Sequence, residues 1–244
     1  MTRVGVVTQA RTTSTRLPGK ILIPLGDRTV LEHHVRRLTA AGLDVYVATT
    51  TNDTDEPVVD LARSLGAPVH RGSEDDVLDR VDGCALVHRL DVVVRVTSDC
   101  PLIDGEVVAR AVDRWLDAGD PLLYLSNVQH RSFPRGFDFE VFGAQALHDA
   151  AREAVRPAQR EHVTPYLYDG SHPGVRLEDV VVEPDASDLR VTLDTEADLA
   201  LIRRLVEDFG ADELGHREIV DVLRAHPELV ALNREVVQKP LDGG

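Results

Sequence analysis

The sequence has few cysteines and no long hydrophobic run. Its 244 residues include two cysteines, Cys84 and Cys100, which lack the spacing of metal ligands. This scarcity argues against a disulfide framework and favours the reducing cytoplasm. No window approaches the ~20 apolar residues that cross a membrane. The apolar run Val4–Val7 is too short for a signal peptide and lacks a small-residue cleavage site, so we expect a soluble, cytoplasmic protein.

Positive charge is also scarce. The 27 Lys and Arg residues are outnumbered by 42 Asp and Glu residues, which gives a formal net charge of -15. Because this excess would repel nucleic-acid phosphates, we expect no DNA or RNA partner. A local cluster of arginine and lysine can still bind a small anion. The expected partner is therefore a small molecule, and neither a nucleic acid nor a membrane.

Apolar segments of strand length alternate with helical patterns in the first half of the chain. Val45–Ala48 and Val92–Val96 show no polar alternation, and Leu31, Val35 and Leu38 have the spacing of one helical face. This order predicts an α/β, Rossmann-like fold, with a mostly parallel sheet covered by helices on both faces and a small mixed α/β extension. A chain of this length with 43% hydrophobic residues fits one domain, 1–244. Such a sheet binds its ligand at the carboxyl ends of its strands.

The second half of the chain shows a more mixed pattern. Its predicted helices are Asp104–Ala118, Pro157–Tyr168, Glu196–Phe209 and Leu214–Val237, the last broken at Pro227. Its predicted strands are Leu122–Leu125, Phe137–Phe142 and Arg190–Leu193.

The loop Gln9–Lys20, directly after the first predicted strand, concentrates cations and hydroxyl groups. An arginine fork, as at Arg11 and Arg16, matches phosphate oxygens, and Lys20 supplies a point charge. A solvated basic loop is the plain alternative. The loop lacks the glycine spacing of a P-loop, and the chain has no Gly-x-Gly-x-x-Gly. We therefore predict a phosphate-binding loop of another type.

Ala10–Lys20 resembles the N-terminal signature of the CMP-sugar synthetases, which include the acylneuraminate and ketodeoxyoctonate cytidylyltransferases. The resemblance is closer to the branch typified by spore coat polysaccharide biosynthesis protein F, which also includes cytidylyltransferases that tailor phosphonates. In that branch a glycine is more usual at the position of Ser98. Further matches follow in the same order at Arg71–Arg80, Arg95–Asp104, Gly136–Phe142, Arg160–Thr164 and Leu193–Leu199.

The resemblance implies a magnesium-dependent nucleotidyltransferase with the fold of the nucleotide-diphospho-sugar transferases. Arg11, Arg16 and Lys20 would hold a triphosphate, and Arg11, Lys20 and Asp99 would be the catalytic residues. Arg71–Ser73 would lie near the pyrimidine or the ribose. The full implied nucleotide-binding set is Ala10, Arg11, Ser14, Arg16, Lys20, Arg71, Gly72 and Ser73.

Asp99 and Asp194 match the two carboxylates that bind the catalytic magnesium in these enzymes, where manganese is also possible. Each follows a predicted strand, and such positions can converge at one rim of a parallel sheet. Magnesium prefers hard oxygen ligands, and two carboxylates brought together without a cation repel each other. A helix cap or a turn is the alternative role for each aspartate.

The resemblance also implies a division into a nucleotide half of about 1–125, an acceptor and dimerisation half of about 126–190, and C-terminal helices at 195–237. A homodimer follows from it. The candidate acceptor-binding residues are Arg135, Asp138, Glu140, Arg160 and His162, although a polar strand face and a helix-surface charge cluster would explain them as well. His33, His34 and Cys100 are assigned no function.

The expected reaction is transfer of CMP from CTP to a sugar acid, a sugar-like alcohol or a phosphonate. Glycosyl transfer from a nucleotide sugar is the first alternative, because related folds support both reactions. A metal-dependent glycosyltransferase typically carries Asp-x-Asp after a central strand, whereas Ser98-Asp99-Cys100 has a single aspartate. A non-catalytic nucleotide-binding protein is the second alternative, and it would not need both carboxylates and all three cations.

Overall fold

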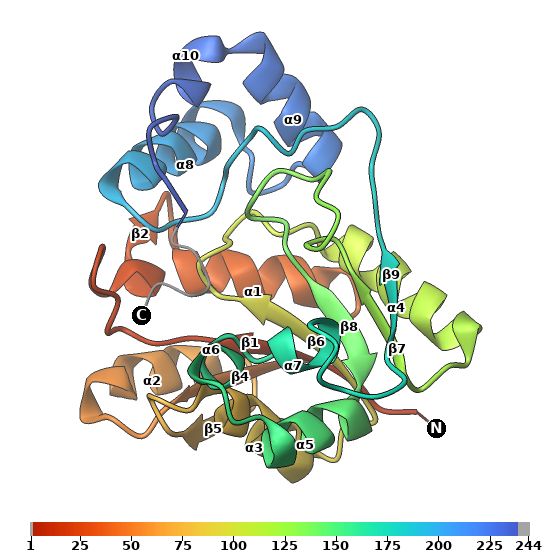
Figure 1. Ribbon diagram of the computed structural model, residues 1–244. Coiled ribbons are helices and arrows are strands. Elements are labelled where there is room, and N and C mark those ends of the chain that lie inside the picture. The colour runs from red at the N-terminus through yellow and green to blue at the C-terminus, as the bar shows by residue number, and fades with distance from the viewer. Residues whose placement is uncertain (1, 239–244) are drawn as a thin grey trace.

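A seven-stranded sheet lies at the centre of the computed structural model, which describes residues 2–238 (Figure 1). Its strand order is β5-β4-β1-β6-β8-β7-β9. β5, β4, β1 and β6 run parallel, β8 is antiparallel to both of its neighbours, and β9 is parallel to β7. The strands are β1 Val4–Gln9, β4 Val45–Thr50, β5 Val69–Gly72, β6 Val92–Thr97, β7 Leu123–Ser126, β8 Glu140–Gly143 and β9 Arg176–Asp179.

The central strands are apolar on both sides because each side faces a separate core. Successive strand residues point to opposite faces of a sheet. Val6 and Val94 are buried in one core, with residues of α1, α2, α4 and α8. Val7 and Val93 are buried in the other, with residues of α3 and α5. The predicted α/β fold, with a mostly parallel sheet and helices on both faces, is confirmed.

The helices surround this sheet, and α8, α9 and α10 gather beyond α1, on the side away from α3 and α5 (Figure 1). A short ladder of β2 (Pro24–Leu25) and β3 (Arg28–Thr29) precedes α1. Among residues 2–238, no helix is long and apolar enough to span a membrane. The helices are α1 Val30–Ala40, α2 Glu56–Ser64, α3 Val77–His88, α4 Gly105–Ala118, α5 Ala144–Glu153, α6 Pro157–His162, α7 Pro165–Tyr168, α8 Glu196–Phe209, α9 His216–Ala225 and α10 Pro227–Val230.

The prediction of one helix over Pro157–Tyr168 is wrong. The segment forms two short helices, because Val163 between them has a φ of 72°, which a right-handed helix does not allow. Pro165 is then well placed to begin α7.

Two strand predictions and the tail also need correction. The predicted strand Phe137–Phe142 begins only at Glu140, because the side-chain amide of Asn127 bonds the backbone of Phe137 and Phe139. Arg190–Leu193 forms a single bridge to Arg135, and its N–H groups bond to loops instead of to a strand. The C-terminal helical region ends at Val230, before the predicted 237. Residues 1 and 239–244 of the predicted 1–244 domain lie outside the described residues.

Candidate active site

Three loops meet beyond the carboxyl ends of β1 and β6. The backbone N–H of Leu193 donates to the carbonyl of Asp99 at 2.8 Å, which joins the segment before α8 to the loop after β6. The hydroxyl of Ser98 donates to the carbonyl of Gln9 at 2.8 Å, which joins the loops after β6 and β1. Ser98 replaces the more usual glycine without strain, because the only non-glycine residues with positive φ among residues 2–238 are Arg89 and Val163.

Lys20 lies between the two aspartates that the sequence singled out. Its ammonium Nζ is 2.7 Å from Asp99 Oδ2 and 2.8 Å from Asp194 Oδ1. Gly19, with a φ of 67°, makes the left-handed turn that starts the 3-10 turn at Lys20. Asp194 also forms an ion pair with Arg16 at 3.0 Å and accepts a hydrogen bond from Arg190 at 2.8 Å. The carboxylates therefore face cations, and the expected repulsion between them does not arise.

Lys20, Asp99 and Asp194 stabilise one another's ionised forms, although burial disfavours each charge. Burial alone would lower the pKa of Lys20, but the charges of Asp99 and Asp194 outweigh it and the pKa is raised. Burial alone would raise the pKa of Asp99, but Lys20 outweighs it and the pKa is lowered. The point between the two carboxylates is therefore one where a positive charge is stable.

The same point suits a divalent cation. Carboxylate oxygens from Asp99 and Asp194 converge on it, and these are hard ligands. No group of three or more His, Cys, Asp or Glu residues that could hold a metal ion occurs in the described part of the chain. Magnesium commonly takes one or two carboxylates and completes its shell with water and substrate phosphates. The residues fit such an ion, provided that the Lys20 ammonium moves away from the two carboxylates when the ion binds.

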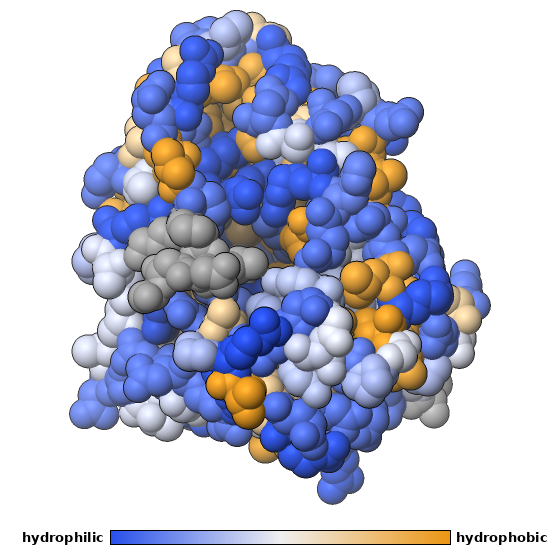
Figure 2. Space-filling view, viewed as in Figure 1, coloured by the Kyte–Doolittle hydropathy of each residue, from blue (hydrophilic) through white to orange (hydrophobic). Residues whose placement is uncertain are grey.

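Two cavities adjoin at this pair of carboxylates. The first, here called the loop pocket, has a volume of about 380 Å³ and lies against the loop after β1. The second, the distal cavity, has a volume of about 660 Å³ and reaches toward β8 and α7. Figure 2 shows this face hollowed between the C-terminal helices and the α3 and α6 side, among mostly hydrophilic residues. Gln9, Arg16, Thr97, Asp99 and Asp194 line both cavities.

The structure places the predicted phosphate-loop residues at the loop pocket. Arg11, Ser14, Arg16 and Lys20 all line it. The side chain of Arg11 is 42% exposed and pairs loosely with Glu74 at 3.5 Å, so it can change partner. The chain therefore presents three cations and a hydroxyl group to one pocket.

Arg71, one of the predicted base-binding residues, is engaged elsewhere. Its guanidinium donates to the carbonyls of Thr50 and Asn52 at 3.0 Å and pairs with Glu56 at 2.6 Å. It thereby fixes the turn after β4. A neighbouring arginine, Arg80 of α3, lines a pocket with Ala10 and Arg11.

Arg80 lines a small pocket of about 120 Å³ with Ala10 and Arg11, here called the Arg80 pocket. Its Nη1 donates to the carbonyl of Ser73, and its Nε is buried with no partner among residues 2–238. An added Cβ at Gly72 would lie 3.0 Å from the Arg80 side chain, so the glycine allows this close approach. Gly72 and Ser73 thus contact the Arg80 side chain directly.

Four of the five acceptor candidates meet in the distal cavity: Arg135, Asp138, Glu140 and His162. The fifth, Arg160, bonds both carboxylate oxygens of Asp76 and the carbonyl of Ala151. Arg160 thus ties α6 to the start of α3. Its guanidinium is directed at these partners.

Sequence reasoning missed several residues that line the distal cavity, and Gln9, Arg95 and Arg131 are among them. Arg95 lies inside the apolar run of β6 and pairs with Glu140 at 2.5 Å. A lone charge within a buried strand was the available signal. Arg131 donates to both oxygens of Asp138, at 2.5 and 2.8 Å, and its position in a loop gave no such signal.

The two histidines and the cysteine that were assigned no function have structural roles. His34 is fully buried and bonds Thr8 Oγ1 at 3.0 Å and the carbonyl of Cys100 at 2.9 Å. Burial lowers the pKa of His34 to about 4. Burial raises the pKa of the Cys100 thiol well above its usual value, so this thiol is no nucleophile. His33 is buried and bonds the carbonyl of Leu25.

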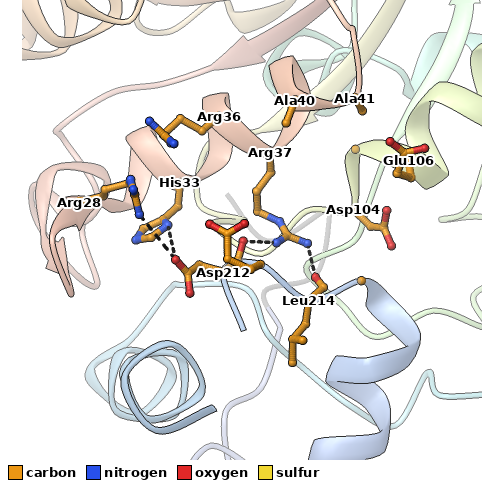
Figure 3. Close-up of a pocket in the computed structure, with 13 residues that line it drawn as sticks. Arg28, His33, Arg36, Arg37, Ala40, Ala41, Asp104, Glu106, Asp212 and Leu214 are labelled. Atoms are coloured by element: carbon orange, nitrogen blue, oxygen red, sulfur yellow. Dashed lines mark hydrogen bonds and ion pairs between the residues drawn. The ribbon is translucent and has the colours of Figure 1, made fainter. Parts of the chain in front are cut away.

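A pocket of about 220 Å³ between α1 and the starts of α4 and α9, here called the Arg37 pocket, is lined by other residues (Figure 3). Arg37 crosses it and donates to the carbonyls of Ile103 and Leu214 at 2.6 Å, and to that of Asp212. Asp104 accepts from both the backbone N–H and Nδ1 of His216 at 2.8 Å. These charges join the C-terminal helices to α1 and α4.

Comparison with known proteins agrees with this geometry. The family model described as Cytidylyltransferase matches residues 6–219. Spore coat polysaccharide biosynthesis protein SpsF of Bacillus subtilis is 31% identical over 246 residues, covering 96% of this chain and 99% of that protein. A solved cytidylyltransferase structure from Leptospira borgpetersenii has a TM-score of 0.90 at 31% identity, covering 98% of this chain and 100% of that one. The structure of CMP:2-keto-3-deoxy-manno-octonic acid synthetase with CTP shares the fold, with a TM-score of 0.65 at 18% identity over 85% of this chain and 99% of that one. The chain therefore belongs to the cytidylyltransferase family, in the CMP-sugar synthetase-like group that includes SpsF.

Proposed function

We propose that this protein transfers CMP from CTP to a small acceptor and releases pyrophosphate, with a divalent cation at Asp99 and Asp194. The observation that carries this proposal is the position of the two carboxylates, which line both the loop pocket and the distal cavity. A nucleotide in the first cavity and an acceptor in the second would have their reacting atoms beside the same pair of carboxylates. Holding two reactants in this way supplies much of a catalysed rate.

The triphosphate would lie in the loop pocket. Arg11, Arg16 and Lys20 would bind its oxygens, and Ser14 would donate a hydrogen bond. Magnesium or manganese, when bound by Asp99 and Asp194, would neutralise charge on the phosphate oxygens. Lys20 would then exchange its carboxylate partners for phosphate oxygens.

The acceptor oxygen would form a bond to the α-phosphorus while the bond to the leaving pyrophosphate breaks. For an acceptor hydroxyl, the proton passes to solvent water as the bond forms, and the leaving pyrophosphate keeps the electron pair of the broken P–O bond. Charge gathers on the phosphate oxygens during this step, so fixed cations stabilise the transition state more than the bound substrate. Arg16 and Lys20, which lie at the junction of the two cavities, are placed for this role.

The Arg80 pocket is the proposed site of the pyrimidine or the ribose. The buried Nε of Arg80, which has no partner among the described residues, offers a donor to an oxygen of the nucleotide. Ala10 and Arg11 line the same pocket, so the base and the triphosphate would lie on the two sides of one loop. A site that hydrogen-bonds one base leaves its donors unpaired with another, which favours CTP over purine nucleotides.

The acceptor is proposed to carry an anionic group. Arg135 lines the distal cavity, and its guanidinium has no hydrogen-bond or ion-pair partner among residues 2–238. Burial and the neighbouring charge of Arg131 lower the pKa of Arg135, which means that its positive charge is disfavoured there. A bound anion would stabilise that charge. The neighbouring Arg131 is already neutralised by Asp138. A carboxylate or a phosphonate therefore suits this cavity better than a neutral polyol.

Pyrophosphate release tests the proposal. Wild-type protein would be assayed with CTP, UTP, ATP and GTP and with sugar acids, polyols and hydroxyalkylphosphonates as acceptors. We expect release with CTP and an anionic acceptor, and its loss in excess chelator. Efficient release with UTP and none with CTP would contradict the nucleotide assignment. Full activity in excess chelator would contradict the metal site.

The proposed homodimer would pair through the edge of the sheet at β9. This strand ends the sheet order, so one side of its backbone has no neighbouring strand among residues 2–238. Leu177 and Val181 are exposed there, and Figure 2 shows hydrophobic residues gathered over this edge. We expect Leu177→Asp to convert a dimer to a monomer in sedimentation, and a monomeric wild type would refute the pairing.

Cys84 and Cys100 are free thiols, which suits the proposed cytoplasmic location.

A further inference from the structure

Gln9, the last residue of β1, lies where all three cavities of the site meet. It lines the loop pocket, the Arg80 pocket and the distal cavity. In the sheet it is paired with Thr97, two residues before Asp99. None of the roles proposed above uses its side chain.

The side-chain amide of Gln9 can take only one orientation. Arg95 donates to Gln9 Oε1 from Nε at 3.2 Å and from Nη2 at 3.0 Å. A guanidinium has donors and no acceptor, so the amide oxygen must face it and the amide NH₂ must face away. The orientation of this amide therefore follows from its partner.

Arg95 is itself held in place from the opposite side. Its Nη1 pairs with the buried carboxylate of Glu140, which also accepts hydrogen bonds from Tyr124 and Thr164. The network Gln9–Arg95–Glu140 lines the floor of the distal cavity. A side chain fixed by such a network is preorganised, because little rotational freedom remains to be lost on binding.

The main chain of Gln9 is fixed as well. Its carbonyl accepts from the hydroxyl of Ser98 at 2.8 Å and from the N–H of Ser98 at 3.3 Å. The amide nitrogen Nε2, by contrast, has no hydrogen-bond partner within residues 2–238. A glutamine with only a structural role would be expected to use both ends of its amide when half-buried.

We infer that the Gln9 amide is a specificity-determining donor that binds an oxygen of the acceptor next to the oxygen that attacks CTP. The amide lies in the acceptor part of the site, because its partner Arg95 lines the distal cavity and neither of the other two pockets. Arg135 lies in the same cavity and suits an anion. The protein would thus recognise two groups of the acceptor: Arg135 would bind an anionic group, and Gln9 would donate a hydrogen bond to a second oxygen. This inference rests on the proposed function.

Gln9→Glu tests it by steady-state kinetics. The variant keeps an oxygen for Arg95 and so keeps the fold, but it lacks the N–H donors and adds a negative charge. The probes are CTP with 3-deoxy-manno-octulosonate, N-acetylneuraminate or 2-hydroxyethylphosphonate. We expect the KM of the probe that the wild type uses to rise at least about tenfold, while the KM of CTP stays within about twofold. A parallel rise in the KM of CTP would overturn the inference.

Gln145→Glu is the matched control. Gln145 is an exposed residue of α5 that lines none of the three cavities, so the substitution adds the same charge without touching Arg95 or the site. We expect its effect on the KM of the acceptor to stay below about threefold, as for a screened surface charge. An effect equal to that of Gln9→Glu would show that added charge, and not the lost donor, is responsible, and would overturn the inference.

A binding measurement separates this inference from the proposed function. The side-chain NH₂ resonances of Gln9 are those absent from the ¹⁵N spectrum of Gln9→Glu. With chelator present to prevent turnover, each of the three probes is added to protein with CTP. We expect at least one probe to move these resonances further than CTP alone does. A shift with CTP alone that no probe increases would overturn the inference, whereas failure of the proposed function would appear as no pyrophosphate release by the wild type.

Discussion

The active centre and the Arg37 pocket are both rich in buried charge, but they use it differently. In the Arg37 pocket, Arg37 is held by backbone carbonyls, and Asp104 is held by His216. In the active centre, Lys20 lies between two carboxylates that a metal would also bind. Arg135 and the amide NH₂ of Gln9 have no partners among residues 2–238. Arg37 and Asp104 are thus paired with groups of the fold itself, whereas the groups of the proposed active site could exchange their present partners for a ligand.

This contrast has a physical reason. A buried charge is unfavourable unless it is paired, so a fold tolerates an incompletely paired group only where a ligand completes it or solvent reaches it. Both groups without partners lie in the 660 Å³ distal cavity, which is large enough for an acceptor. We therefore expect substitutions in the two regions to separate loss of activity from loss of stability.

Asp99→Asn and Asp194→Asn should have the largest effect. Each removes a proposed metal ligand, so turnover in the pyrophosphate assay should fall at least about a hundredfold. Asp212→Asn, in the Arg37 pocket, is the control and should keep near-normal turnover. Neither active-site change should relieve repulsion, because Lys20, Arg16 and Arg190 already pair with these carboxylates. Turnover within tenfold of wild type for either variant would contradict the metal site.

Arg37→Met should have the next largest effect, and this effect should be a loss of folding stability. It leaves the carbonyls of Ile103, Asp212 and Leu214 without their donor, so the free energy of unfolding should fall by about 2 kcal/mol or more. Urea unfolding measures this, and the KM of CTP at low temperature should not change. Arg36→Met removes an exposed arginine from the same helix and should change stability by less than about 0.5 kcal/mol. Equal effects of the two substitutions would refute the structural role of Arg37.

Lys20→Met should have a mixed effect. It removes a proposed phosphate contact, so the KM of CTP should rise about tenfold. It also leaves Asp99 and Asp194 without their shared ammonium, so the variant should be less stable in chelator. Added magnesium should raise the melting temperature of Lys20→Met more than that of the wild type, because the ion takes the place of the ammonium. Arg28→Met, at the Arg37 pocket, should show no such gain, and an equal gain in both variants would contradict a specific site.

The smallest effect concerns pH. Burial alone would raise the pKa of Asp104, but the hydrogen bonds from His216 outweigh it and hold the pKa well below its usual value. A lowered carboxyl pKa contributes stability above the unfolded-state pKa and loses it as pH falls through the folded-state value. The stability difference between wild type and Asp104→Asn should therefore shrink as pH falls below about 4, near the ordinary aspartate value. A difference independent of pH in urea unfolding would contradict this linkage.

Elements with strong local signals could be predicted from the sequence. The bounds of α8 follow from the apolar spacing and from Thr195, which caps it, and the structure has the predicted Glu196–Phe209. The Pro157–Tyr168 region could not be predicted, because the positive φ of Val163 is a local conformation that the helical spacing of side chains does not reveal.

Candidate residues could be named from the sequence, but their partners could not. Arg11, Arg16 and Lys20 stand in one short loop, so their shared role is visible in the chain itself. That Arg71 bonds the turn after β4 while Arg80 lines the pocket beside Ala10 depends on where the two side chains reach in the fold, which requires coordinates.

The sequence by itself determined the alternating α/β pattern, the cation-rich loop after the first strand and the two candidate aspartates, because each of these is local chemistry or local spacing. Only the tertiary structure decided that Lys20 lies between Asp99 and Asp194, which stand 79 and 174 residues further along the chain. It alone decided that Arg95 orients the amide of Gln9 from 86 residues away. Hydrogen bonds have a short range and a fixed direction, so such pairs exist only once the strands and loops that carry them have packed together.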